Sequence, residues 1–472
     1  MMRSVTRQLE TDYLIIGAGA MGMAFADVLQ TESDSNFLLV DRHARPGGHW
    51  NDSYPFVRLH QPSAFYGVNS SPLGDNTIDQ VGWNAGLFEL ASGTEVVTYF
   101  EQVMQRQFLP SGRAQYFPMC NYLGDQRFES LVSGETFEVS ATKIVDATYM
   151  NVKVPSVVGP SYDVADGVCC VALNELPKTT TPPGGYVIVG AGKTGMDAIL
   201  WLLANDVDPD AITWITPRDS WILDRANIQP GADAWDTTLG NAAAQIHASA
   251  EATSVDDLFD RLEAAGSLMR IDPDVRPTMY RCATCTRVEL TQLRRIRRVV
   301  RMGRVRSIEP QRVVLDDGEI STTPRSLYVD CAADGLERRA SVPVFEGNRL
   351  TLQTVRHCQQ AFSAALLAHI EVVYSDEATK NQLATVVPHP NTDIDWLRTA
   401  LGNTINSAMW REDGALTDWL TDARLDGFSR SRMGAGSNAS QRASLELIAE
   451  HGLQSVLNLQ RLIAVAEIDG RM

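Results

Sequence analysis

A glycine pattern near the start of the chain constrains its fold more than any other feature. The apolar run of residues 13–16 leads into a Gly-x-Gly-x-x-Gly motif at residues 17–22, and a helical pattern follows. A second apolar run, residues 37–40, ends at Asp41. A buried strand, three spaced glycines, a helix and a second strand ending in an acid are the parts of a dinucleotide-binding βαβ unit.

Each position of this unit has a chemical task. Gly17 permits the tight turn, Gly19 lets the backbone approach a pyrophosphate, and Gly22 lets the helix pack closely on the strand. The helix N-terminus supplies N–H groups and a positive dipole to the phosphates. Asp41 is expected to accept hydrogen bonds from a ribose. The predicted cofactor contacts of this unit are Gly17, Gly19, Ala20, Met21, Gly22, Asp41 and Arg42.

The same arrangement occurs a second time in the middle of the chain. The apolar run of residues 186–189 is followed by a second Gly-x-Gly-x-x-Gly motif, a helical pattern and the apolar strand of residues 212–216. No acid follows that strand, and Arg218 lies close to its end. A basic residue there suits a 2′-phosphate, so NADPH is favoured over NADH. The predicted contacts of this second unit are Gly190, Gly192, Lys193, Thr194, Gly195 and Arg218.

A Gly-Gly turn follows Asp41 and ends in Trp50. The first glycine motif, the acid and this turn together resemble the FAD end of the class B flavin monooxygenases, which include the flavin-containing and the Baeyer–Villiger monooxygenases. The resemblance implies FAD at the first site, with Asp41 on the adenosine ribose and Trp50 near the flavin. Gly48 and His49 are further predicted contacts within the turn. The linker signature of that family, which contains a histidine, is absent between Thr148 and Tyr186, so the chain resembles a divergent member of the family.

His60 is the candidate catalytic residue. It lies six residues after Tyr54, where the flavin-containing monooxygenases have an asparagine and the Baeyer–Villiger enzymes an aspartate near the flavin N5 and C4a edge. A histidine there could donate a hydrogen bond to a flavin hydroperoxide, or act as an acid or base on the substrate. A structural histidine that holds the loop is the alternative.

The predicted fold class is α/β, with two dinucleotide-binding (Rossmann-like) domains of the FAD/NAD(P) flavoprotein type, a helical insertion and a helical C-terminal tail. We expect the strand of residues 327–331 to return the chain to the FAD domain, where Gln353 is a further cofactor contact. The predicted boundaries are residues 8–150 for the first part of the FAD-binding domain, 184–325 for the NADPH-binding domain with its insertion at about 226–295, 326–375 for the FAD-binding return, and 376–472 for the helical tail.

The composition and net charge limit the classes of partner that this chain is expected to bind. A formal net charge of −17 disfavours nucleic acid and anionic membrane surfaces, and no apolar run approaches the length of a membrane span. Seven scattered cysteines argue against a disulfide framework and for a reducing compartment, and with no visible signal peptide a cytoplasmic location is expected. The helical tail is a candidate homodimer contact.

The pair Cys282-x-x-Cys285 is spelled like the redox pair of the bacterial thioredoxin reductases, but it lies far beyond the second glycine motif. No second pair or neighbouring histidine in the sequence completes a zinc site, so no metal is predicted.

The sequence therefore predicts an FAD-dependent, NADPH-consuming monooxygenase that uses O₂ to oxygenate a small molecule through a peroxyflavin, as the resemblance implies. Two alternatives stay open. One is a flavin-dependent NAD(P)H oxidoreductase or oxidase, with Cys282 and Cys285 exchanging electrons in the reductase version. The other is a non-enzymatic flavoprotein that binds NADPH poorly because the linker signature is missing.

Overall fold

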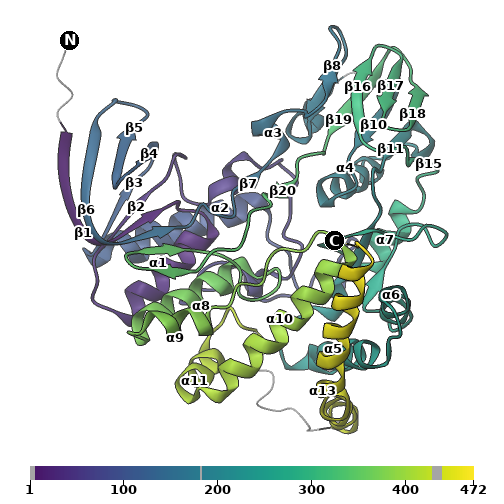
Figure 1. Cartoon of the computed structure of the whole chain (residues 1–472). Coiled ribbons are helices and arrows are strands. Elements are labelled where there is room, and N and C mark those ends of the chain that lie inside the picture. Colours follow the sequence, from purple (N-terminus) through teal and green to yellow (C-terminus); the bar gives the residue numbers. More distant parts are fainter. Residues whose placement is uncertain (1–5, 181–182, 428–437, 472) are drawn as a thin grey trace.

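The first nucleotide fold is built on an eight-stranded sheet that contains the N-terminal strand. The computed structural model describes residues 6–180, 183–427 and 438–471 (Figure 1). The strand order is β21-β22-β6-β1-β2-β3, with the hairpin β4-β5 added beside β6. The pairs β6-β1, β1-β2 and β2-β3 are all parallel. The bounds are β1 Thr6–Ile16, β2 Phe37–Val40, β3 Ala114–Phe117, β4 Cys120–Gly124, β5 Arg127–Ser130, β6 Thr136–Asp146, β21 Phe345–Glu346 and β22 Arg349–Thr351.

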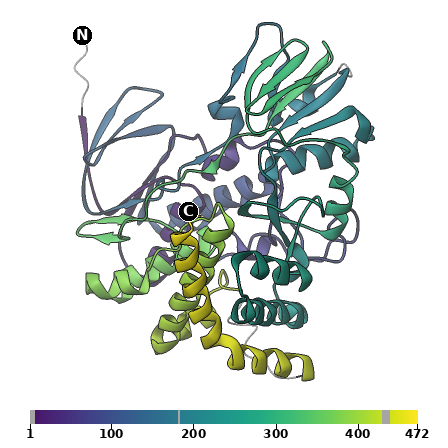
Figure 2. The same cartoon turned by 45° about the vertical axis from the view of Figure 1, so that its right-hand side comes forward.

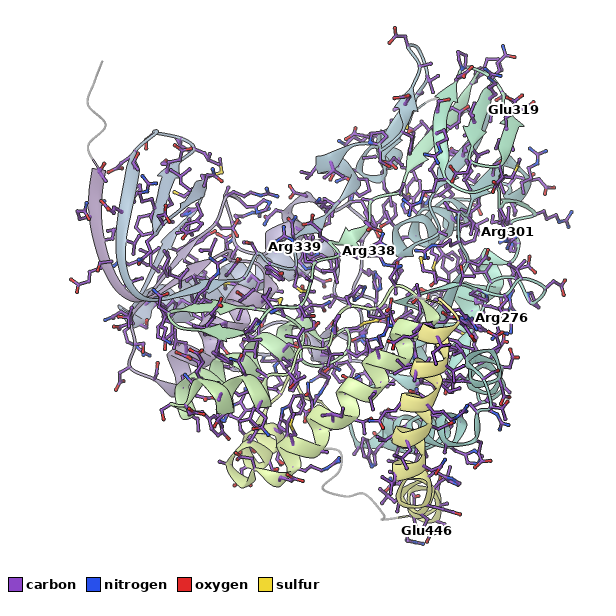
Figure 3. All side chains as sticks on the ribbon, in the orientation of Figure 1. Arg276, Arg301, Glu319, Arg338, Arg339 and Glu446 are labelled. Carbon is purple, nitrogen blue, oxygen red and sulfur yellow. A yellow bond between two sulfur atoms is a disulfide. The ribbon has the colours of Figure 1, made fainter. Side chains whose placement is uncertain are left out.

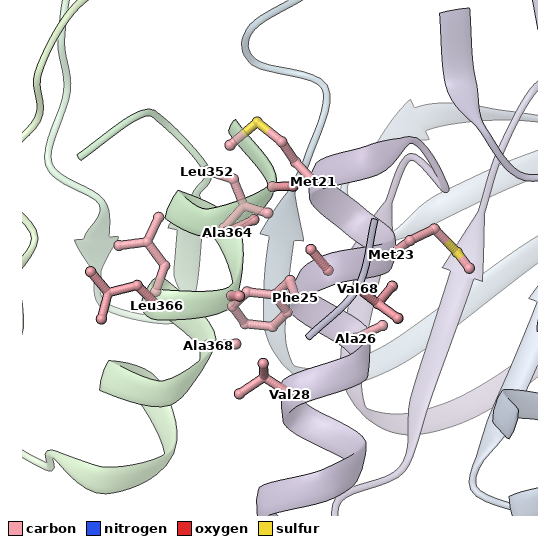
Figure 4. Close-up of a cluster of buried hydrophobic side chains, with 14 of the residues drawn as sticks. Met21, Met23, Phe25, Ala26, Val28, Val68, Leu352, Ala364, Leu366 and Ala368 are labelled. Atoms are coloured by element: carbon pink, nitrogen blue, oxygen red, sulfur yellow. The ribbon is translucent and has the colours of Figure 1, made fainter. Parts of the chain in front are cut away.

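Two helices far apart in the sequence pack together against this sheet. Helix α1 (Ala20–Glu32) buries residues 21–29, and α8 (Gln360–Val373) is buried from Ala361 to Glu371. Figure 4 shows Phe25 of α1 against Ala364 and Ala368 of α8, where small side chains leave room for the ring. Truncating a ring buried in this way costs about 3–5 kcal/mol. This packing fixes the direction of α1, and therefore the place of its N-terminus.

The second nucleotide fold has a five-stranded, all-parallel sheet with the order β15-β11-β10-β19-β9. Helix α4 (Lys193–Ala204) follows its central strand. A smaller sheet, β18-β17-β16-β8, completes this half of the molecule. The bounds are β8 Asp163–Val164, β9 Cys170–Ala172, β10 Gly185–Val189, β11 Ile212–Ile215, β15 Arg298–Val300, β16 Val305–Glu309, β17 Arg312–Leu315, β18 Gly318–Ser321 and β19 Ser326–Asp330.

The domain boundaries differ from the prediction at both ends of the second fold. The strand that was expected to return to the first fold, β19, pairs with β10 instead, with Tyr186 opposite Leu327. A buried apolar strand suits the centre of either parallel sheet, so its pattern cannot say which sheet it joins. The return begins at β20 (Gly335–Leu336), which pairs with β7 (Val152–Lys153) between the two halves (Figure 1). Strands β8 and β9, before residue 184, also belong to the second half.

The insertion and the C-terminal helices form one further layer. The insertion contains α5 (Trp235–Glu251), α6 (Val255–Ala264) and α7 (Arg287–Leu293), but also a three-stranded sheet of β12 (Ser220–Asp224), β13 (Leu268–Met269) and β14 (Met279–Cys285). The predicted helical insertion is therefore mixed. The predicted helical tail is confirmed by α9 (Glu377–Leu383), α10 (Asp393–Glu412), α11 (Gly414–Asp422) and α13 (Ala439–Ile468).

Helix α13 lies along α5 of the insertion, as both views show (Figures 1 and 2). The Asn458 amide donates to the carbonyls of Ser249, Ala250 and Ala252 at the C-terminal end of α5. The tail thereby supplies partners for carbonyl groups that a helix end leaves free. None of the described helices is both long and apolar enough to span a lipid bilayer.

Candidate nucleotide-binding and active site

The first glycine loop has the geometry that the sequence predicts. Gly17 has φ +100°, and a Cβ on Gly22 would lie 1.9 Å from the Gly17 carbonyl oxygen. Helix α1 begins at Ala20 and Met21 with no side chain capping its N-terminus. Uncapped N–H groups at the positive end of a helix are a site for a phosphate.

The Gly-Gly turn lies directly on this loop. The Gly47 N–H donates to the Ala18 carbonyl at 2.8 Å. A Cβ on Gly48 would lie 3.0 Å from the Gly19 Cα, so the two glycine backbones are in contact. Backbone alone therefore lines this part of the site, and a pyrophosphate can approach it from two loops.

Asp41 holds the loop rather than standing free. Its Oδ2 accepts a hydrogen bond from the Ala18 N–H at 2.6 Å, and its Oδ1 accepts from the His43 N–H at 2.8 Å. The His43 ring joins Asp41 to Asp52, with Nδ1 and Nε2 at 2.8 and 2.9 Å from the two carboxylates. The hydrogen bond to Asp41 raises the pKa of His43. The ribose contact of Asp41 stays a prediction, and its neighbour Arg42 is exposed.

Trp50, the aromatic residue at the end of the Gly-Gly turn, also has a hydrogen-bond partner. The Trp50 indole N–H donates to the Tyr66 hydroxyl at 2.7 Å, and the two rings meet edge to face. Burial lowers the pKa of His49, beside Trp50, to about 4. His49 is therefore a neutral imidazole at pH 7.

The second glycine loop repeats the first. Gly190 has φ +127°, and a Cβ on Gly195 would lie 2.2 Å from the Gly190 carbonyl oxygen. Helix α4 begins at Lys193 and Thr194, again with no side-chain cap. Around Gly192 there is open space, since a Cβ there would meet nothing within 4 Å.

A loop from the first fold reaches the second one. The Tyr54 hydroxyl donates to Asp197 Oδ2 of α4 at 2.5 Å, and Lys193 is ion-paired with the same carboxylate. Burial and the charges of Lys193 and Arg225 hold the pKa of His60 well below its usual range. His60 therefore lies near the second glycine loop as a neutral imidazole, which can donate an N–H hydrogen bond but has no extra proton to give at pH 7.

Arg225 is a residue that the sequence reasoning missed. It is buried, and its Nε donates to the His60 carbonyl at 2.9 Å. Its Nη1 lies 3.0 Å from Asn84 Oδ1 and 3.0 Å from Glu289 Oε2. Arg225 thus ties the His60 loop to the insertion. Its sequence signal, one arginine directly after the apolar strand β12, does not distinguish it from a surface residue.

A group of arginines surrounds the position predicted for a 2′-phosphate. Burial and the neighbouring charges of Arg304, Arg338 and Arg281 lower the pKa of Arg218. Asp334 pairs with Arg281 at 2.8 Å and with Arg338 at 2.9 Å. Arg218 donates to Asn391 Oδ1 at 3.0 Å, and within the described residues it has no ion pair. The group keeps an excess of positive charge that a phosphate can neutralise.

A cavity of about 90 Å³ lies beside these arginines, lined in part by Arg281, Arg338, Arg339 and Tyr149. Figure 3 shows Arg338 and Arg339 between the two folds. Gln353 also lines it, but its amide is bonded to the Val342 backbone, with Oε1 accepting at 3.2 Å and Nε2 donating at 2.8 Å. Gln353 therefore shapes the wall, and its cofactor contact stays a prediction.

The two cysteines of the Cys-x-x-Cys motif do not form a pair. Cys282 is joined by a disulfide to Cys358, with Cα atoms 6.7 Å apart, and Cys285 is a free, buried thiol. The scattered cysteines argued against a disulfide framework, and the described residues contain this one disulfide. The fold supplies a histidine that the neighbouring sequence lacks, because His357 Nε2 is 3.0 Å from the Cys282 sulfur. Neither contact could be deduced from sequence, since Cys358 is 76 residues away.

Two glycine loops at uncapped helix N-termini, each following a strand with parallel neighbours, define a protein with the two-dinucleotide-fold architecture of flavoproteins. A family model described as an NAD(P)-binding Rossmann-like domain matches residues 15–70, which confirms the nature of the first fold.

The chain is 57% identical over 420 residues to the uncharacterized protein Rv2000 of Mycobacterium tuberculosis, covering 89% of this chain and 78% of the relative. The uncharacterized protein Mb2023 of Mycobacterium bovis matches to the same extent, at 57% identity over 420 residues. The chain belongs to the family of these mycobacterial proteins.

The chain is similar to several solved structures at low sequence identity. One is a cyclohexanone monooxygenase bound to ε-caprolactone, with a TM-score of 0.49 and 13% identity over 93% of this chain and 98% of that one. Another is the OTEMO complex with FAD and NADP, with a TM-score of 0.47 and 14% identity over 77% and 84% of the two chains. A flavin monooxygenase from Stenotrophomonas maltophilia has a TM-score of 0.45 and 13% identity, over 78% and 100%.

Proposed function

We propose that this protein is an FAD-dependent, NADPH-consuming monooxygenase that oxygenates a small molecule. The observation that supports it best is the pair of uncapped glycine loops joined by the Tyr54–His60 loop of the first fold. The Tyr54 hydroxyl of this loop donates to Asp197 of α4, which is ion-paired with Lys193, so a ligand of one fold can meet a ligand of the other. Hydride transfer between two bound dinucleotides needs such an arrangement.

The residues of each loop fit the cofactor that we assign to it. At the first loop, the backbones of Gly17, Gly19 and Gly48 would hold the pyrophosphate of FAD. No side chain crosses the contact between Gly19 and Gly48. When bound, the flavin supplies the redox and oxygen chemistry. Asp41 orders the loop through Ala18, and Trp50 is fixed by Tyr66 as one wall of the site.

At the second loop, Gly192 and the first turn of α4 would hold the pyrophosphate of NADPH, and Arg218 its 2′-phosphate. Arginine is suited to this task because its guanidinium makes charge-assisted, bidentate hydrogen bonds to phosphate oxygens. His60 would donate an N–H hydrogen bond at the reacting edge of the site. Its depressed pKa keeps it neutral, so it would orient and polarise rather than protonate.

The reductase alternative is disfavoured, because Cys282 and Cys285 do not form a redox pair. Cys285 is buried, and burial raises the pKa of its thiol to about 12. A thiol of that pKa carries almost no thiolate at pH 7 and is a poor nucleophile. Its motif partner Cys282 is bonded to Cys358 rather than to Cys285.

The test is a rapid-mixing experiment on the purified, FAD-loaded chain. The protein is reduced with NADPH or NADH without oxygen, then mixed with oxygenated buffer while flavin absorbance and released hydrogen peroxide are followed. We expect faster reduction by NADPH than by NADH. We also expect reoxidation that releases less peroxide than the NADPH consumed once a substrate from a panel of ketones, sulfides and amines is present.

The matched control is Gly192→Ala, because the added methyl meets no protein atom and affects only the space for a nucleotide. This variant should bind FAD normally and be reduced slowly. Peroxide release equal to NADPH consumption across the whole panel would favour an oxidase. A failure of both nicotinamides to reduce the flavin would favour the non-enzymatic flavoprotein.

A further inference from the structure

Four side chains that can bind a metal converge where the insertion meets the first fold and the tail. Cys282 belongs to β14, His357 and Cys358 lie between β22 and α8, and His389 precedes α10. The ligand atoms of Cys282, His357 and Cys358 all lie within 4.8 Å of one another. His389 lies next to this group, with Nδ1 3.9 Å from the sulfur of Cys358.

The disulfide alone does not account for the two imidazoles. A disulfide sulfur has no proton to donate and is a weak acceptor, so an imidazole nitrogen gains little by approaching it. Here each sulfur is approached by one such nitrogen, at 3.0 Å for His357 and 3.9 Å for His389. In a tetrahedral zinc site, sulfur and nitrogen ligands lie about 3.6 Å apart, as bond lengths of about 2.3 and 2.1 Å require. The observed distances bracket this value.

The backbone at both cysteines is unusual in the same way. Cys282 has φ +58° and Cys358 has φ +56°, which is the left-handed region that side chains other than glycine seldom adopt. Strand β14 also shifts its register at this point, because Tyr280 pairs with Trp221 but Thr284 pairs with Leu223. Such a bulge redirects a side chain, and backbone strain of this kind concentrates at functional sites.

We propose that Cys282, Cys358 and His357 bind a structural Zn²⁺ ion, with His389 as its fourth ligand. Two thiolates and two neutral imidazoles are a ligand set that zinc prefers. The chain takes up the ion in its dithiol form, where Zn²⁺ replaces the two thiol protons and no electrons are transferred. The disulfide is the oxidised, metal-free form of the same two sulfurs, and a phosphine or thiol reductant supplies the two electrons that return it to the dithiol.

The site would support the neighbouring group of arginines. Arg281 directly precedes Cys282, and Asn391, which accepts the hydrogen bond from Arg218, lies two residues after His389. The metal would thus join three separate segments and position both sides of the cavity. This inference does not depend on the proposed function, because metal content is measured without turnover.

The test uses the full-length chain, purified with a phosphine reductant and without chelator. Zinc is counted by elemental analysis, and thiols are counted by alkylation and intact mass. We expect about one Zn²⁺ per chain, as a closed four-ligand site requires. Replacement by Co²⁺ should give the intense visible bands of a tetrahedral ion with thiolate ligands, and these need no variant to fold.

Variants then assign the ligands. Cys282→Ser, His357→Gln and Cys358→Ser should each lower zinc affinity more than about 100-fold, beyond the 10–100-fold cost of losing an outer partner. The exposed Cys169 offers the matched control, and Cys169→Ser should keep its zinc. Full zinc content in Cys358→Ser, or a reduced wild-type chain that binds neither Zn²⁺ nor Co²⁺, would overturn the proposal.

Discussion

The two nucleotide folds of this chain each contain a glycine loop of the same type, but different groups pack around the two loops. In both, the first glycine donates to the end of the second strand, Gly17 to Val40 and Gly190 to Ile215. The residue after that strand is Asp41 in the first fold and Thr216 in the second. The Asp41 carboxylate accepts a hydrogen bond from the glycine loop, whereas Thr216 Oγ1 is buried with no hydrogen-bond partner among the described residues.

The two glycine loops also differ in whether another segment packs on them. Gly48 lies on Gly19 in the first fold, while the space around Gly192 is open. One loop is therefore held by a carboxylate and a second turn, and the other has open space around its middle glycine.

The largest effect on stability should come from replacing the third glycine of each motif, Gly22 in the first fold and Gly195 in the second. Gly22→Ala and Gly195→Ala each place a methyl group within 1.9 or 2.2 Å of a backbone oxygen, which cannot move independently of its strand. We expect each to lower the free energy of unfolding by about 3 kcal/mol. Urea denaturation measures this, with Gly192→Ala as the control of unchanged stability. If Gly195→Ala were as stable as the control, the two loops would not be equivalent.

Removing Arg218 should sharpen the difference between the two folds. A charge-assisted hydrogen bond contributes about 1.5–3 kcal/mol, so Arg218→Ala should weaken NADPH binding by roughly 10–100-fold and NADH binding little. Titration calorimetry with both nucleotides measures the ratio. Arg297 is an exposed arginine of the same chain, and Arg297→Ala is the matched control. Equal losses for the two nucleotides would exclude a phosphate contact.

The residues that follow the second strand should respond unequally. Asp41→Asn weakens an acceptor with backbone and imidazole donors, so we expect a loss of about 1–3 kcal/mol in unfolding free energy and a lower FAD content. Thr216→Val removes a hydroxyl that has no partner, and should change stability by less than about 0.5 kcal/mol. Urea titrations of both variants, with flavin counted after purification, test the contrast. Similar losses in the two would mean that Asp41 has no special role in its loop.

The smallest effect should be the pH dependence of the first fold. The folded-state pKa of His43 is raised above its ordinary 6.5. The imidazolium between Asp41 and Asp52 therefore stabilises the fold fully below pH 6.5, and this contribution is lost as the pH rises through the raised pKa.

Comparing the wild type with His43→Gln in urea, below and above this window, should show a difference of about 1 kcal/mol or less that disappears at the higher pH. Thr216→Val, which alters no ionisable group, should show no such trend. A difference that grew with pH would reverse the assigned sign.

The sequence predicted the features that depend on residues close together in the chain, and it missed those that depend on tertiary contacts. The glycine loops were predicted correctly, because their steric requirements involve residues three to five positions apart. The sheet that β19 joins was not predicted correctly, because the apolar pattern of this strand fits either sheet. The hydrogen bond from Ala18 to Asp41 and the position of Arg225 depend on tertiary contacts that have no sequence period. The same holds for Cys282 and His357, which lie on segments far apart in the chain.

The pairing of α13 with α5 has a consequence for how the molecule is assembled. Helix α5 ends at Glu251, yet its partner begins at Ala439, and the first sheet is likewise completed only by β21 and β22, within residues 345–351. Contacts between such distant segments form late, because the entropy of closing a long loop precedes any gain from the contact. We expect a slow final folding phase in which α13 docks, and a partly folded intermediate that exposes the apolar face of the insertion before it.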